Sequence, residues 1–107
     1  MPEHEPAKFL LYRGDTLLGT ITHDPARDDF PWSAGLFAAA DGYLSVKHLF
    51  DEERRLLSNS QYEEFDKIWK EIEGPGLQMR LIGTNRVLSG GLLHIDGDRA
   101  SWRTMRD

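Results

Sequence analysis

The sequence predicts an α+β domain in which two consecutive helices pack on one face of a mainly antiparallel sheet. Three observations support this prediction. Apolar side chains recur at helical spacing between residues 45 and 76, strand-like runs lie on both sides of this segment, and glycine-containing turns separate the runs. The 107 residues are the length of a single domain. We expect about five to seven short strands, and we expect residues 1–6 to be a disordered tail.

The second helix has the clearest pattern. Ser60 and Glu63 have the spacing of a capping box, in which each side chain binds the backbone N–H of the other residue. Gly74 suits the left-handed conformation that ends many helices, and Pro75 cannot continue a helix. We therefore expect a helix that begins after Ser60 and stops at Gly74. Its apolar face consists of Tyr62, Phe65, Ile68, Trp69 and Ile72.

The first helix carries a carboxylate within its apolar stripe. Ser45 is the preferred N-cap, although Asp41 could begin an earlier turn. On a helical wheel of about 100° per residue, Glu53 falls near the middle of the apolar face. An unpaired buried carboxylate costs several kcal/mol, so we expect a partner: a C-terminal arginine, a Tyr or Trp donor, or backbone N–H groups. We favour a structural contact between helix and sheet over a general acid or ligand contact. A bent helix that turns Glu53 to the rim is a further alternative. The apolar face of this helix consists of Val46, Leu49, Phe50, Leu56 and Leu57.

Strands are predicted in the segment that precedes the two helices. Phe9–Tyr12 and Thr16–Thr22 flank a Gly-Asp turn and should form a hairpin. Both faces of this hairpin are apolar, so we expect it to be covered on both sides. Ser33–Ala39, with small side chains, reads as a weak third strand. The expected pairs in the hairpin are Tyr12 with Leu17 and Leu10 with Gly19.

The segment after the helices returns to the alternation of a strand. Residues 77–81 and 86–88 should be strands, and Leu92–Ile95 and Arg99–Arg103 should form a hairpin around Asp-Gly-Asp. Two registers of this hairpin are possible. We prefer the one with Gly97-Asp98 at its centre, because it pairs Asp96 with Arg99 and Leu93 with Trp102.

Composition restricts the compartment and the partners. The chain has no cysteine, which excludes disulfides and thiol chemistry. Its N-terminus lacks the features of a signal peptide, and no apolar run could cross a bilayer, so we expect a cytoplasmic protein without membrane contact. The net charge of −5 argues against a nucleic-acid partner. Residues 1–76 are acidic and residues 77–107 are net basic, an asymmetry that can orient a protein partner or a second copy.

The loop before the third predicted strand contains a candidate contact site. The charged side chains of Asp28 and Asp29 favour exposure of this loop to solvent. Phe30 and Trp32 flank a proline. The two aromatic side chains could seal the end of the core, which we favour because aromatic residues are usually buried. They could also form an exposed anchor for a partner. The candidate partner-binding or ligand-binding residues are Asp28, Asp29, Phe30, Trp32, Glu53 and His94.

Few other residues suggest a metal-binding or catalytic site. His94, Asp96 and Asp98 form a string that could bind a metal together with His23 and Asp24, but hairpin chemistry explains the acidic residues. No serine lies in a nucleophile turn, and we expect no catalytic residue, metal or cofactor.

No motif assigns a family, although the chain resembles small bacterial α+β proteins in general character. We expect a non-enzymatic protein-interaction module. It would be either a homodimer or an acidic partner, such as an immunity or antitoxin-like protein. The alternative is a small-molecule or metal site, including a small enzyme that uses His94, Asp96 and Glu53.

Overall fold

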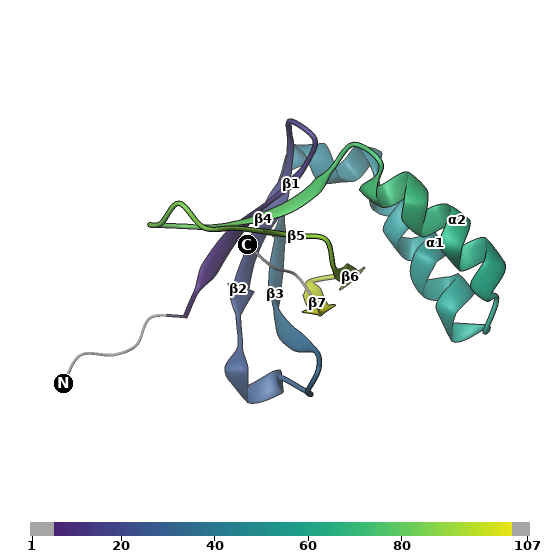
Figure 1. Cartoon of the computed structure of the whole chain (residues 1–107), viewed down its shortest axis with the longest axis horizontal. Coiled ribbons are helices and arrows are strands. Elements are labelled where there is room, and N and C mark those ends of the chain that lie inside the picture. The colour runs from purple at the N-terminus through teal and green to yellow at the C-terminus, as the bar shows by residue number, and fades with distance from the viewer. Residues whose placement is uncertain (1–5, 104–107) are drawn as a thin grey trace.

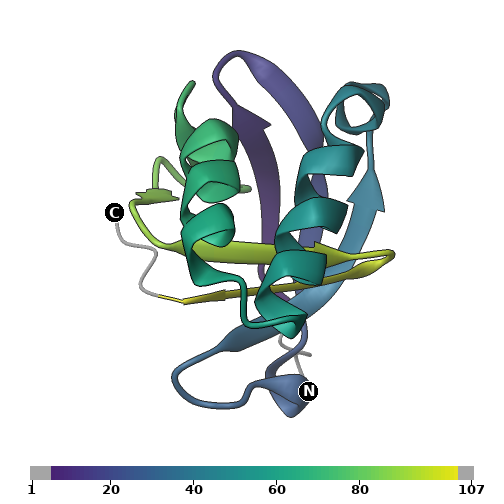
Figure 2. The same ribbon diagram turned by 90° about the vertical axis from the view of Figure 1, so that its right-hand side faces the viewer.

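Seven strands form one antiparallel sheet in the computed structural model of the chain, which describes residues 6–103. The sheet is curled and two helices cover one side of it (Figures 1 and 2), so the predicted α+β fold is confirmed. Across the sheet the strand order is β5-β4-β1-β2-β3-β7-β6. In chain order the elements are β1 (Lys8–Arg13), β2 (Thr16–His23), the 3₁₀ helix η1 (Pro25–Arg27), β3 (Ser33–Ala39), the 3₁₀ helix η2 (Asp41–Ser45), α1 (Lys47–Ser58), α2 (Tyr62–Glu73), β4 (Leu77–Leu81), β5 (Val87–Ser89), β6 (Leu92–Asp96) and β7 (Arg99–Arg103).

The hydrophobic core lies between the inner face of the sheet and the helical segment. Successive residues of a strand point to opposite faces, so most strands contribute alternate side chains to this core. The sheet supplies Phe9, Leu11, Leu18, Ile21, Phe37, Leu77, Met79, Leu93, Ile95, Ala100 and Trp102. The helical segment supplies Tyr43, Val46, Leu49, Phe50, Trp69 and Ile72.

The hairpin of β1 and β2 contains a bulge. One residue of β2, Leu18, has no partner on β1. Leu18 and Ile21 are three positions apart and would face opposite sides of a regular strand, and the bulge allows both to enter the core. The predicted pairing of Leu10 with Gly19 is therefore wrong, and Leu10 instead opposes Thr20.

The outer face of the same hairpin has no covering layer within residues 6–103. Leu10 and Tyr12 are only half-buried there, and the guanidinium carbon of Arg80 lies 4.1 Å from the centre of the Tyr12 ring. The prediction that both faces are covered is wrong. A single helical layer packs on this sheet, and long side chains shield part of its other face.

The C-terminal hairpin has the preferred register. Asp96 opposes Arg99 and Leu93 opposes Trp102, so Gly97 and Asp98 form the turn. β7 also pairs with β3, which extends the sheet and leaves β6 as its edge strand. α1 packs against β6, and this contact brings the helix to the candidate site.

Both helices begin later than their sequences suggest. Ser45 belongs to η2, where its hydroxyl donates to the carbonyl of Gly42 at 3.0 Å, and α1 begins at Lys47. The alternative of an earlier turn from Asp41 is confirmed by η2. Ser60 has a left-handed backbone, with φ of 57°, which turns the chain between the helices. An N-cap needs an extended backbone, so no capping box forms and α2 begins at Tyr62.

The end of α2 also differs from the prediction. Gly74 keeps a helical backbone, and Gly76 is the residue in the left-handed region, with φ of 97°. Arg13 reaches the last turn from β1, donating from Nε to the carbonyl of Ile72 at 2.9 Å and from an Nη to that of Glu71 at 2.8 Å. A cation from another element therefore caps this helix terminus.

The far ends of the two helices project beyond the sheet (Figure 1). Leu57 and Tyr62 lie at these ends and are 39% and 61% exposed, although both were expected on apolar faces. None of the helices within residues 6–103 has the length and apolar character needed to cross a membrane.

Candidate functional site

The carboxylate of Glu53 is buried against the ring of His94. Glu53 has no solvent exposure, as its place in the apolar stripe of α1 predicted. Its Oε1 is hydrogen-bonded to Nδ1 of His94 on the edge strand β6. Its Oε2 is also buried and has no hydrogen-bond partner in residues 6–103. The partner is thus a histidine, and not the arginine, aromatic donor or backbone group that the sequence suggested.

His94 offsets the cost of burying Glu53. A carboxyl group without water is costly unless it is hydrogen-bonded. The contact with Nδ1 of His94 supplies that hydrogen bond and leaves the second ring nitrogen, Nε2, on the opposite side of the ring from Glu53.

Trp32 packs on the same imidazole. The centres of the Trp32 and His94 rings are 4.8 Å apart with an angle of 33° between their planes, and the guanidinium carbon of Arg103 lies 5.5 Å from the Trp32 ring centre. Trp32 is half-buried, whereas Phe30 is 97% exposed. Phe30 therefore does not seal the core, and Trp32 covers His94 at the edge of the sheet.

The loop between η1 and β3 is held by its own hydrogen bonds. The carboxylate of Asp28 accepts from the backbone N–H of Ala34 at 2.8 Å and contacts Nε2 of His23 at 3.0 Å. The backbone groups of Asp29 and Trp32 bond each other reciprocally, at 2.9 and 2.7 Å. The hydrogen bond from Ala34 lowers the pKa of Asp28, and His23 adds to this effect. Asp28 therefore supports the loop, while Asp29 is exposed beside Phe30.

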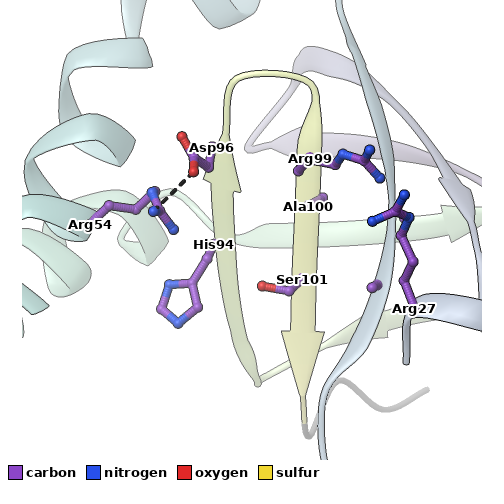
Figure 3. A pocket seen from close by; sticks show the side chains of 9 residues that line it. Arg27, Arg54, His94, Asp96, Arg99, Ala100 and Ser101 are labelled. Carbon is purple, nitrogen blue, oxygen red and sulfur yellow. Dashed lines mark ion pairs between the residues drawn. The ribbon is translucent and has the colours of Figure 1, made fainter. Parts of the chain in front are cut away.

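A pocket of about 280 Å³ opens beside His94 (Figure 3). Arg54 on α1 forms an ion pair with Asp96 on β6 at 3.0 Å, along one side of this pocket. Ser101 lies directly opposite His94 in the ladder of β6 and β7. The sequence patterns did not identify Arg27, Arg54, Arg99 or Ser101 as site residues. The lining residues are Arg27, Ala34, Gly35, Arg54, His94, Asp96, Arg99, Ala100 and Ser101.

The proposed metal string is separated in the structure. His94 is hydrogen-bonded to Glu53, and Asp96 forms an ion pair with Arg54. Asp98 lies in the turn, with its carboxylate 3.9 Å from Nε of Arg99. Residues 6–103 contain no group of three or more histidine, aspartate or glutamate side chains that could hold a metal ion. Asp98 lies in the turn as the hairpin interpretation expected, whereas Asp96 contacts α1 through Arg54.

No protein-family model matches this chain, and neither the curated proteins nor the solved structures contain a match. The functional argument therefore depends on the geometry of the molecule itself.

Proposed function

We propose that the protein is a non-enzymatic protein-interaction module that binds its partner through Phe30. The proposal is carried by the exposure of this side chain. At 97%, Phe30 is more exposed than any other large apolar residue in the described part of the chain. Aromatic residues that enter a pocket of the partner dominate the binding energy of many interfaces.

The loop between η1 and β3, residues 28–32, is called the Phe30 loop. It supports such a role because hydrogen bonds and packing already hold its backbone. Asp28 binds the start of β3, the backbones of Asp29 and Trp32 bond each other, and Trp32 packs on His94. Binding then requires little further ordering of the backbone around Phe30. A smaller loss of conformational entropy gives a larger net affinity for the same contact.

The charge of the chain favours a basic partner. The net charge is −5, and the exposed Asp29 lies next to the aromatic anchor. We propose a partner protein with an apolar pocket for Phe30 and lysine or arginine side chains on the rim of that pocket. The arrangement fits the acidic member of a complex, such as an immunity or antitoxin-like protein that neutralises a basic toxin. A homodimer is the other form of the proposal.

Affinity capture with three forms of the full chain tests this proposal. The baits are the wild type, Phe30→Ser, and Leu44→Ser as the matched control. Leu44 is 72% exposed on η2, beyond the other end of β3. We expect a protein to be captured by the wild type and by Leu44→Ser, but not by Phe30→Ser, and to be released by salt. If the protein is a homodimer, light scattering should instead show the molar mass of a monomer when Phe30 is replaced.

Two results would contradict the proposal. One is a wild-type protein that stays monomeric and captures nothing at low salt. The other is a partner or dimer that Phe30→Ser retains as well as Leu44→Ser does. In that case another surface would make the contact, and the exposure of Phe30 would have no part in it.

A further inference from the structure

We infer that the pocket beside His94 is a binding site for an oxyanion, namely the phosphate or carboxylate group of a small molecule. The pocket is lined by residues of α1, η1, β3, β6 and β7, and its arginines come from three different elements (Figure 3). This site is separate from the contact proposed for Phe30 and does not depend on it.

Three guanidinium groups border the pocket. An arginine has five N–H donors in a planar group that matches the oxygens of phosphate and carboxylate. The side chains of Arg27, Arg54 and Arg99 are 59%, 38% and 46% exposed, so a ligand can reach them from solvent. Their present partners are single surface carboxylates, and ion pairs of this kind contribute little. These pairs are Arg27 with Asp24 at 3.3 Å, Arg54 with Asp96 at 3.0 Å, and Arg99 with Asp98 at 3.9 Å.

His94 and Ser101 add polar groups from the sheet. Glu53 holds Nδ1 of His94 from the buried side, so the ring orientation is fixed and Nε2 remains for a ligand. Trp32 packs over the same ring and restrains it further. Ser101 faces the pocket on the neighbouring strand, and its hydroxyl can donate to an anion.

The lining of the pocket is richer in arginine than the chain as a whole. Three arginines and one carboxylate, that of Asp96, line it, and Asp24 and Asp98 pair with two of these arginines from outside the lining. An anion in the pocket would replace these surface carboxylates as the partner of the guanidinium groups. The volume of about 280 Å³ suits an anionic group with a short remainder of a small molecule.

Titration of the full chain with inorganic phosphate, and separately with acetate, tests the inference. Backbone amide NMR shifts are followed at fixed pH, and sodium chloride keeps the ionic strength constant. We expect saturable shifts in residues around the pocket. Arg99→Gln and Arg27→Gln should each weaken binding by about tenfold, as expected for loss of a hydrogen bond to a charged group. Arg80→Gln is the matched control, because Arg80 lies over Tyr12 on the outer face of the sheet and should leave the affinity unchanged.

The two titrations also distinguish the anion. Saturation by phosphate alone assigns a phosphate group, and saturation by acetate alone assigns a carboxylate. Either result supports the site if Arg99→Gln weakens it and Arg80→Gln does not. Absence of saturable shifts with both anions would overturn the inference. Equal effects of the Arg99 and Arg80 substitutions would overturn it as well, since binding would then reflect the general charge of the surface.

Discussion

Glu53 on α1 and His94 on β6 form a buried hydrogen bond that joins the helical pair to the edge of the sheet. The two residues are 41 positions apart, and the chain between them contains α2, β4 and β5. His94 also contacts Trp32 and lines the pocket. One contact therefore serves the packing of α1, the support of the Phe30 loop and the orientation of a pocket residue.

Glu53→Gln should lower the free energy of unfolding by about 3 kcal/mol. The amide keeps the shape of the side chain but replaces the buried carboxylate, so the pair with His94 is broken inside the protein. Urea denaturation at neutral pH measures the change.

Glu52→Gln is the matched control for this substitution. Glu52 is the preceding residue of α1 and pairs with Arg55 near the surface, so its loss should cost no more than about 1 kcal/mol. Replacing Glu53 and His94 together by leucine should cost less than Glu53→Gln, because no charge is then left buried. A loss below about 1 kcal/mol for Glu53→Gln would rule out a buried charge pair.

Trp32→Ala should lower the free energy of unfolding by about 2 kcal/mol. This is less than the roughly 3–5 kcal/mol of a fully buried aromatic residue, because Trp32 is half-buried. Trp32→Phe should retain part of the contact with His94, which is worth about 0.5–1.5 kcal/mol, and should cost less. Chemical denaturation measures both variants. Equal stability of Trp32→Ala and the wild type would show that the ring contact does not hold the loop.

Asp28 should make stability depend on acidic pH. Its pKa is lower in the folded state than its ordinary value of 3.8, so it stabilises the fold above about pH 4, and this contribution is lost as the pH falls through the folded-state pKa. Asp28→Asn should be less stable than the wild type at neutral pH, and the difference should shrink as the pH falls below about 4. Denaturation midpoints between neutral and acidic pH measure this. Asp29→Asn is the control and should change the stability by no more than about 0.5 kcal/mol at neutral pH, because Asp29 is exposed. A difference for Asp28→Asn that does not change with pH would refute this role.

Gly35→Ala should open the contact between β2 and β3. A Cβ at this position would lie 2.4 Å from the carbonyl oxygen of Thr22 and 3.2 Å from Cγ2 of Ile21. The backbone must shift to relieve these contacts, and overpacking of this kind costs about 1–3 kcal/mol. Thermal unfolding measures the loss. Stability within about 0.5 kcal/mol of the wild type would mean that the two strands separate easily.

The strands follow from the sequence because their signals are local. The alternation of Leu77 and Met79, and the turn at Gly97 and Asp98, depend on neighbours only, and the preferred register is the observed one. The helix boundaries were harder to predict from the sequence. Ser60 has the composition of an N-cap, but the short link between the helices requires it in a left-handed conformation. The bulge at Leu18 leaves no mark in composition either.

The candidate site could be predicted only in part. The inward place of Glu53 follows from helical periodicity, whereas its partner depends on the pairing of β7 with β3, which sets β6 beside α1. That pairing joins segments far apart in the chain and has no local signal. The preferred hairpin register does imply that His94 opposes Ser101, so part of the pocket was within reach of the sequence.

The protonation of His94 is the most direct test of the link between the buried pair and the pocket. Long-range proton–nitrogen NMR of the imidazole reports which ring nitrogens carry a proton, and Glu53→Gln serves as the comparison. We expect Nδ1 to carry a proton in the wild type that the hydrogen bond to Glu53 protects from exchange, and we expect Glu53→Gln to weaken this protection. A wild-type ring with no proton on Nδ1 would contradict donation from His94 to Glu53, and with it the ring orientation on which the pocket depends.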